Sequence, residues 1–301
     1  MTVLIAWVRT IQDCEELIFV SDSRLNDWRN FDTCPKVLTL PRNDCAIAFS
    51  GDTKDAYPMM LQLGLAIDAH EPLRVGSLDV SSLKSHALKI FDSMAHLIEH
   101  SDHVVGEVEA DPTTFLFGGY SWVNKQFELW SIAYRQSENK FVARPAQWAC
   151  YSEEAKKVVF RSMKSPQAGE IASKIAFAGD QGKAARELLT AKLAKVHPTS
   201  MTYRGLGWEP FEVVRDMLRD PNHSYTIGGA PQVLKVYQYM RTAPLGVYWP
   251  DKKSGTIYLQ GRPALGYERM DRWVLDPDTM HSESPKHSRN DADDATQESL
   301  P

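Results

Sequence analysis

Four short apolar runs open the chain: TVLIAWV at residues 2–8, LIFVS at 17–21, KVLTL at 36–40 and CAIAFS at 45–50. They are rich in β-branched and aromatic residues, and polar segments separate them. This pattern is typical of short strands joined by turns. We therefore expect the chain to begin with a β-meander.

Two helices are predicted to follow the meander. The first covers about residues 55–67, with Pro58 in its first turn, where the missing N–H of proline costs nothing. The second covers about residues 81–99, and its apolar side chains recur at helical spacing. Such an apolar stripe packs against a sheet.

The second half of the chain repeats this order of strands and helices. Strands are predicted over residues 114–117, 127–134, 174–178 and 232–239, with a turn near Asn124 and a final hairpin over residues 244–260. Helices are predicted directly after Gly179-Asp180 and over residues 210–219. Two groups of strands with helices and no regular βαβ alternation predict the α+β class.

The composition favours one folded domain and a polar tail. The chain has 301 residues, of which 43% are hydrophobic, enough for the core of one large domain or two small ones. We assign residues 1–275 to a single domain. Residues 276–301 contain almost nothing apolar, so they cannot recover their ordering entropy and are predicted to be a disordered tail.

Charge and cysteine usage limit the class of protein. The net charge of -5 with scattered basic residues argues against a dedicated nucleic-acid surface. Four cysteines without a CxxC pair suit a reducing compartment and indicate no zinc site. No apolar run approaches the roughly 20 residues that cross a bilayer, and no signal pattern is visible. We expect a cytoplasmic protein without a membrane segment, cofactor or metal.

Three stretches occur in order within the first 56 residues: Phe19-Val-Ser-Asp22-Ser-Arg24, then Lys36-Val-Leu, then Phe49-Ser-Gly51-Asp-Thr-Lys-Asp55-Ala56. This ordered set resembles the opening of proteasome β subunits, which are N-terminal-nucleophile (Ntn) hydrolases. The resemblance implies a four-layer αββα sandwich of two antiparallel sheets flanked by helices. It also implies a threonine protease that cleaves amide bonds, with peptide or protein as the substrate.

In that family the nucleophile is a threonine at the mature N-terminus, and Thr2 matches it once Met1 is removed. A threonine hydroxyl is a weak nucleophile and needs a base, which the free α-amine of the same residue can supply, because its reference pKa is about 8. The expected reaction forms an acyl-enzyme on Thr2 Oγ, which water then hydrolyses. Thr2 is small enough for ordinary removal of Met1. A strand that merely begins at Thr2 is the structural alternative.

The resemblance gives roles to the other matching residues. The charge of Lys36 would lower the pKa of the Thr2 amine and hydroxyl, and Asp22 would hold the Lys36 ammonium in place. Gly51, after Ser50, matches the residue whose backbone N–H faces the developing oxyanion. Arg24 is assigned to structure, paired with carboxylates near a turn.

Two departures from the family pattern concern the support of the nucleophile. Where the family has a serine that assists proton transfer, this chain offers Gly179, Asp180 or Gln181, and Asp180 could serve as the acceptor. Where the family has Asp three residues before a serine in Ser-Gly-Gly, this chain has Ser224 and Ile227. These departures concern peptidase activity more than the fold.

Two other functions stay open at this point. A catalytically inactive, proteasome-like ring or scaffold subunit would keep the fold without the chemistry, but α-type subunits carry a helix before the first strand, and here the strand follows Met1 directly. A small-molecule binding module on the Gly118-Gly119 and Gly228-Gly229 turns is weaker, because glycine pairs mainly form turns. The resemblance further implies a homo-oligomeric ring and an ATPase or other regulatory partner, which residues 195–210 and the tail could contact.

Overall fold

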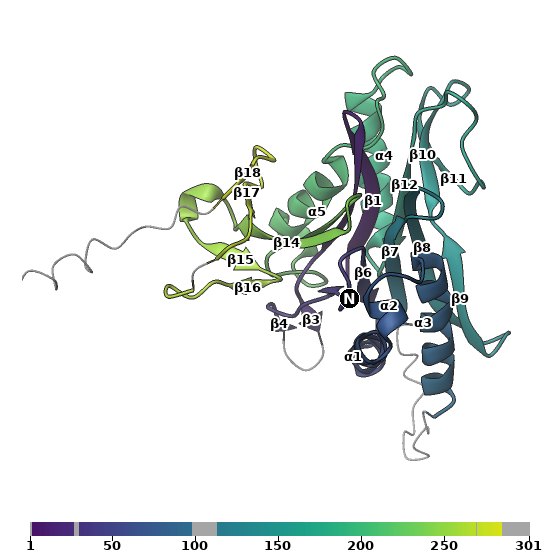
Figure 1. The fold of residues 1–301 in the computed structure, drawn as a ribbon. Coiled ribbons are helices and arrows are strands. Elements are labelled where there is room, and N and C mark those ends of the chain that lie inside the picture. The colour runs from purple at the N-terminus through teal and green to yellow at the C-terminus, as the bar shows by residue number, and fades with distance from the viewer. Residues whose placement is uncertain (1, 27–29, 98–112, 269, 285–301) are drawn as a thin grey trace, which may run out of the picture.

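The computed structural model describes residues 2–26, 30–97, 113–268 and 270–284 (Figure 1). Strands dominate this part of the chain. Eighteen strands form three sheets, and 26% of the described residues are helical.

The largest sheet has eleven strands and carries both ends of the described chain. Its strand order is β11-β10-β12-β1-β2-β13-β14-β15-β16, with β17 beside β14 and β18 beside β17. All of its pairs are antiparallel except β14 with β17. The strands are β1 (Leu4–Ile11), β2 (Cys14–Ser21), β10 (Gln147–Ser152), β11 (Lys157–Arg161), β12 (Ala172–Ala178), β13 (Gln232–Tyr237), β14 (Arg241–Tyr248), β15 (Ile257–Leu259), β16 (Arg262–Pro263), β17 (Val274–Leu275) and β18 (Ser282–Glu283).

The other two sheets are smaller. A five-stranded antiparallel sheet has the order of the chain itself: β5 (Val37–Thr39), β6 (Cys45–Ser50), β7 (Thr114–Ser121), β8 (Gln126–Arg135) and β9 (Lys140–Pro145). β3 (Leu25–Asn26) pairs with β4 (Asn30–Phe31) to form the third.

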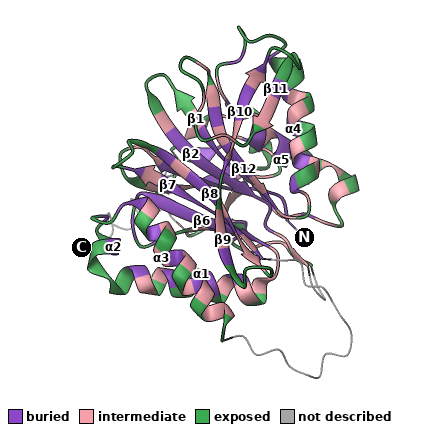
Figure 2. Cartoon of the chain, turned by 90° about the vertical axis from the view of Figure 1, so that its right-hand side faces the viewer, coloured by how far each residue is buried: buried purple, intermediate pink, exposed green. Residues whose placement is uncertain are grey.

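The eleven-stranded and five-stranded sheets bury an apolar layer between them. Because side chains alternate along a strand, every second residue of β1 faces this layer. Its larger members are Leu4, Leu17, Phe19, Leu116, Phe127, Leu129 and Leu234. Figure 2 shows the buried strands of both sheets in the middle of the molecule.

Each helix packs on one of the two large sheets. α1 (Thr53–Ala69), α2 (Glu71–Arg74) and α3 (Val80–Ala95) contribute to a second apolar cluster with Phe49, Phe115 and Phe117 of the five-stranded sheet. α4 (Gly182–Val196) and α5 (Glu209–Arg219) contribute to a third with Ile5, Trp7 and Val233 of the eleven-stranded sheet. Two short 3₁₀ helices, Pro221–His223 and Lys252–Ser254, complete the helical segments.

The predicted four-layer αββα sandwich of two antiparallel sheets flanked by helices is wrong for this chain. The described residues form three sheets with 18 strands, helices account for only 26% of them, and one strand pair is parallel. The short, partly polar strands β9, β10 and β11 and most of those after β14 were not foreseen from the sequence. With these strands, the fold contains more β structure than a sandwich of two sheets covered by helices.

Single elements match their predictions more closely. β8, β12 and β13 confirm the strands predicted over 127–134, 174–178 and 232–239, and a turn at 122–125 joins β7 to β8. α1 begins earlier than predicted, because Asp52 caps it by accepting from Lys54 N at 2.8 Å, and Pro58 therefore lies inside the helix. α3 ends at Ala95, and residues 98–99 of that prediction lie outside the described residues.

Gly118 and Gly119 lie within β7 and do not form the expected turn. A Cβ at Gly118 would lie 2.8 Å from the Glu128 carbonyl oxygen and 2.8 Å from Leu17 Cδ2. A Cβ at Gly119 would lie 2.6 Å from Cys45 Cβ. These glycines therefore allow neighbouring backbone and side chains to approach closely, which removes the basis for a binding turn at this position.

The C-terminal segment is described as far as residue 284. Residues 276–284 make a turn and strand β18, which pairs with β17 through Leu275 and Ser282. The remaining part of the predicted tail, residues 285–301, lies outside the described residues.

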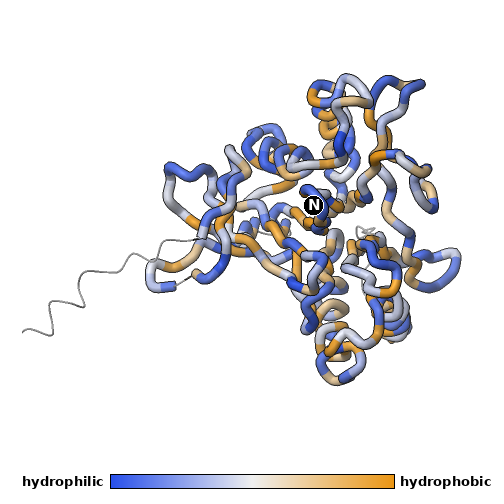
Figure 3. Tube along the Cα trace, turned by 45° about the horizontal axis from the view of Figure 1, so that its top comes forward, coloured by the Kyte–Doolittle hydropathy of each residue, from blue (hydrophilic) through white to orange (hydrophobic). Residues whose placement is uncertain are grey.

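Hydrophobic stretches gather in the interior of the molecule, and hydrophilic ones lie mainly in the loops and on the outer helix faces (Figure 3). Among the described residues, no helix combines the length and the apolar character that a bilayer crossing requires.

Candidate active site

Thr2 precedes β1, which lies between β12 and β2 in the middle of the eleven-stranded sheet. In this register Leu4 is opposite both Ala178 and Ser21. The main chain of Thr2 is held by the segment after β12, because Thr2 N donates to Asp180 Oδ1 and Thr2 O accepts from Gln181 N at 3.2 Å. Thr2 is 3% exposed.

The Lys36 side chain joins Thr2 to Asp22. Lys36 Nζ donates to Thr2 Oγ1 at 2.9 Å and to Asp22 Oδ1 at 2.9 Å. Both members of the Lys36–Asp22 ion pair are fully buried. Because a buried charge is costly unless it is paired and hydrogen-bonded, this arrangement fixes the ammonium group beside the threonine hydroxyl.

Asp22 follows β2 and is held by backbone donors on both of its oxygens. Oδ1 accepts from Val3 N at 3.2 Å. Oδ2 accepts from Arg24 N at 3.1 Å and from Gly228 N at 3.4 Å. These donors leave the carboxylate little freedom, so Asp22 orients Lys36.

Gln232, at the start of β13, supports the segment that carries Lys36, and it was not singled out from the sequence. Its Oε1 accepts from Lys36 N at 2.8 Å and from Val37 N at 3.2 Å. Its Nε2 donates to the carbonyl oxygens of Asp22 at 3.2 Å and Cys34 at 2.6 Å. The only sequence feature that marks it is a glutamine at the head of an apolar strand, and in the fold this side chain is fully buried and hydrogen-bonded.

Gly179 allows the segment after β12 to approach Thr2. Its φ is +89°, in the region that favours glycine. A Cβ at this position would lie 2.8 Å from the Thr2 carbonyl carbon and 3.1 Å from Thr2 Cβ. Any larger residue would displace Thr2 or the loop.

Asp180 is the residue of the three candidates after β12 whose side chain contacts Thr2. Its Oδ1 accepts from Thr2 N, and its Oδ2 accepts from Gln181 Nε2 at 3.2 Å. The carboxylate therefore lies beside the nitrogen that becomes the α-amine if Met1 is removed. Met1 itself lies outside the described residues.

Arg24 has the structural position expected of it. It forms a two-point ion pair with Asp32, Nε to Oδ1 at 2.5 Å and Nη2 to Oδ2 at 2.7 Å, and it also donates to the Ser224 carbonyl oxygen. Gly228 lies against this guanidinium, because a Cβ there would be 2.5 Å from Arg24 Nη2.

The remaining predicted site residues are Ser224, Ser50 and Gly51. Ser224 Oγ donates to the Pro221 carbonyl oxygen at 2.7 Å, and Ser50 Oγ to the Thr114 carbonyl oxygen at 3.4 Å. Gly51 follows β6 with φ +102°, a conformation that suits glycine. The roles predicted for these residues stay predictions.

Cys34 and Tyr57 lie close to the Lys36 segment. Burial raises the pKa of the Cys34 thiol, although the charge of Lys36 acts in the opposite direction. Burial also raises the pKa of Tyr57, whose hydroxyl donates to the Pro35 carbonyl oxygen at 3.1 Å. Both groups are therefore neutral near pH 7, and the Cys34 thiol is a poor nucleophile.

A search of the described residues for three or more His, Cys, Asp or Glu side chains placed to bind one metal ion finds none. No model of a known protein family matches the chain, and no curated protein matches it.

Proposed function

We propose that this protein is a threonine hydrolase that cleaves amide bonds, with Thr2 as the nucleophile after removal of Met1. One observation carries the proposal: the buried Lys36 Nζ lies 2.9 Å from both Thr2 Oγ1 and Asp22 Oδ1. A fixed positive charge beside a hydroxyl stabilises the developing alkoxide and so favours nucleophilic attack.

In the proposed reaction, Thr2 Oγ attacks the carbonyl carbon of the amide while its proton passes to the Thr2 α-amine, directly or through water. The resulting tetrahedral intermediate expels the leaving amine, which takes that proton. Water then attacks the ester on Thr2, with the α-amine again as the base, and releases a carboxylic acid. The reaction therefore consumes one water molecule for each amide bond and needs no redox partner.

Lys36 and Asp180 act in opposite directions on the pKa of the α-amine in this scheme. The positive charge of Lys36 lowers it, and the carboxylate of Asp180 raises it. Asp180 is exposed, so water screens its effect, whereas Lys36 is fully buried. We expect the amine to remain a competent base near neutral pH because the two effects partly cancel.

The oxyanion of the tetrahedral intermediate is assigned to the backbone N–H of Gly51, beside Ser50. Support comes from the resemblance of Phe49-Ser-Gly51 to the family motif and from the positive φ of Gly51, which only glycine adopts easily. Ser224 is proposed only as an outer supporting residue.

The substrate class, assembly and compartment belong to the proposal as well. The resemblance to proteasome β subunits favours peptides or unfolded proteins as substrates, a homo-oligomeric ring and an ATPase or other regulatory partner. A cytoplasmic location is supported by cysteines that are all free, three of them buried.

Intact-mass spectrometry with and without an epoxyketone tests the proposal, because this electrophile reacts with both the hydroxyl and the α-amine of an N-terminal threonine. We expect a chain without Met1 that gains one adduct at residue 2. Thr2→Ala should give no adduct, and Thr2→Ser, which keeps both groups, should still react.

Retained Met1 would contradict the proposal, and it would favour a catalytically inactive ring or scaffold subunit. Processed protein that fails to react would show that the amine is present but the hydroxyl is not activated. That result would also overturn the assignment of Lys36.

A further inference from the structure

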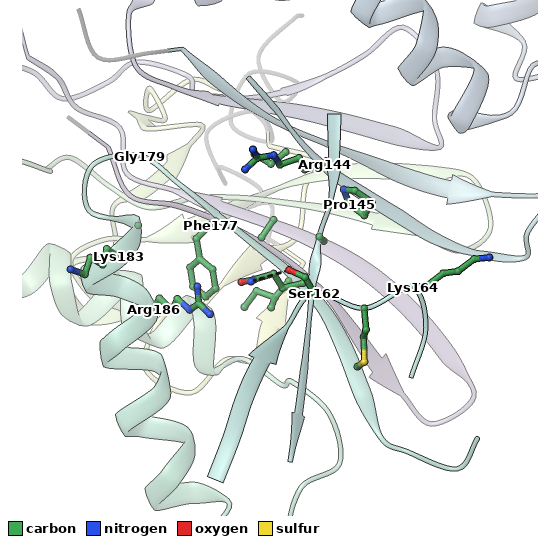
Figure 4. Close-up of a pocket in the computed structure, with 15 residues that line it drawn as sticks. Arg144, Pro145, Ser162, Lys164, Phe177, Gly179, Lys183 and Arg186 are labelled. Carbon is green, nitrogen blue, oxygen red and sulfur yellow. Dashed lines mark hydrogen bonds between the residues drawn. The ribbon is translucent and has the colours of Figure 1, made fainter. Parts of the chain in front are cut away.

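A cavity of about 850 Å³ lies where the chain passes from β9 to β10 and where α4 begins (Figure 4). Four basic residues line it, and no Asp or Glu does: the four are Arg144, Lys164, Lys183 and Arg186. The cavity reaches Gly179, whose backbone touches Thr2, so it lies beside the candidate active site.

The four basic side chains have no acidic partner in the part of the chain that the structure describes. Arg186 lies over the Phe160 ring at 5.2 Å, which holds its guanidinium in place. In Figure 4, Arg144 and Arg186 lie on opposite sides of Phe177, and Lys164 and Lys183 extend outward. Like charges around one cavity repel each other, and an anionic ligand would remove this repulsion.

The wall of the cavity includes an unpaired strand edge. β12 pairs with β10 only from Ala172 to Ile175, where Ile175 lies opposite Gln147. Residues 176–178 pair with β1 on one side, and on the other side they have no strand partner among the described residues. A free strand edge of this kind can pair with an extended peptide.

We propose that this cavity binds an acidic peptide segment, extended along residues 176–178 of β12, with its carboxylates on Arg144 and Arg186. Arginine binds carboxylates through two parallel hydrogen bonds, which favours it over a simple point charge. The unpaired edge of β12 favours a peptide over a small anion, because its backbone groups can hydrogen-bond with the backbone of a peptide.

That the bound acidic segment belongs to the substrate rests on the proposed function. A Cβ at Gly179 would lie only 3.1 Å from Thr2 Cβ, so a segment in the cavity would flank the bond presented to Thr2. The protein would then prefer substrates with acidic residues on one side of the cleaved bond.

Fluorescence anisotropy with the full chain carrying Thr2→Ala tests binding without cleavage. The probes are a dye-labelled Glu-rich peptide, a Gln peptide of the same length and a single-stranded DNA oligonucleotide. We expect the Glu peptide to bind about tenfold or more tightly than the Gln peptide, and this difference to shrink at high salt.

Variants of the two arginines identify the cavity as the site. R144E/R186E should weaken binding of the Glu peptide by about tenfold or more, and R144K/R186K should retain most of it. K89E/K253E changes the net charge equally at exposed positions outside the cavity and should bind like the parent chain. Circular dichroism checks that every variant is folded.

Equal binding of the Glu and Gln peptides would overturn the inference, as would equal binding by R144E/R186E and K89E/K253E. Tighter binding of the oligonucleotide than of the Glu peptide would overturn the inference, because it would identify a nucleic acid as the ligand of the cavity. A failure of the proposed function can be distinguished from a failure of this inference. The first appears as absent epoxyketone labelling at Thr2, whether or not the acidic peptide binds.

Discussion

Lys36 is the residue on which the candidate site depends most directly. Its ammonium and the Asp22 carboxylate are both fully buried, so neither can be removed without consequences for the other. A site of this kind combines stability and reactivity in one ion pair, and the two can be measured separately.

Lys36→Met should abolish epoxyketone labelling and destabilise the protein. The substitution leaves Asp22 buried without its cation, which costs about 3–5 kcal/mol. Urea unfolding measures the loss of stability, and intact mass measures the labelling. Lys89→Met, at an exposed position on α3, is the matched control and should change neither. A Lys36→Met protein that labels normally would contradict the role of the buried charge.

Asp180→Asn should move the acidic limb of the pH–activity profile to lower pH. Removing the carboxylate lowers the pKa of the adjacent α-amine, so the amine becomes an uncharged base at a lower pH. Because Asp180 is exposed, the shift should be only about half a pH unit. The rate of epoxyketone labelling against pH measures it, with Glu154→Gln at an exposed turn as control. A shift to higher pH would exclude this role.

Among the elements, β12 and the turn after it set the position of Thr2. The strand aligns Ala178 with Leu4, and Gly179 then lets the chain cross the Thr2 backbone. The position of Thr2 is therefore determined by a segment more than 170 residues away in the sequence.

Gly179→Ala should destabilise the protein more than Gly169→Ala and should slow labelling of Thr2. Both glycines have positive φ, +89° and +82°, so both substitutions strain the backbone by about 1–3 kcal/mol. Only Gly179 has Thr2 within contact distance, whereas the space around Gly169 is open. The two variants are compared by their thermal unfolding and by their rates of Thr2 labelling. Equal effects would show that close approach to Thr2 is unimportant.

The sequence predicts some elements well and others poorly, for physical reasons. β8 and β12 were identified because their apolar residues alternate or cluster over enough positions to give a clear pattern. β11 is short and begins with Lys and ends with Arg, and β9 begins with Lys and ends with Arg-Pro, so neither gives a clear apolar pattern. Their strand character comes from pairing with distant neighbours, which no local pattern records.

The candidate site also combines residues that a local pattern predicts with a residue that only distant pairing brings in. Thr2, Asp22 and Lys36 lie within one local motif, and the structure brings all three together. Gln232 belongs to a strand nearly 200 residues further on, so its hydrogen bonds to the Lys36 segment could not be inferred from spacing. Supporting residues of this kind become visible only when the sheet is known.

For the molecule as a whole, the apolar layer between the two large sheets holds the site together. β1 and β2 contribute to it from the eleven-stranded sheet, and β5 and β6 from the five-stranded sheet. Thr2 lies just before β1 in the first sheet, and Lys36 directly precedes β5 in the second. Loosening this layer should therefore separate Thr2 from Lys36.

Leu234→Ala, in the middle of this layer, should cost about 2–5 kcal/mol and reduce labelling of Thr2. Leu234 is fully buried, and the cavity left by the substitution would lie between β13 and the five-stranded sheet. Leu188→Ala, on an exposed part of α4, should cost far less. Guanidinium unfolding and labelling rates check both, and unchanged labelling would show that the site tolerates a looser layer.

The place of β1 between β12 and β2 has a consequence for protein synthesis. A ribosome makes the chain from its N-terminus, so Thr2 emerges well before Asp180 and Gln232, whose segments hold it and the Lys36 segment in place. Thr2 therefore cannot be held in its final position while the nascent chain is still short. The proposed hydrolase activity would therefore arise only late in synthesis, through the order in which the strands are made.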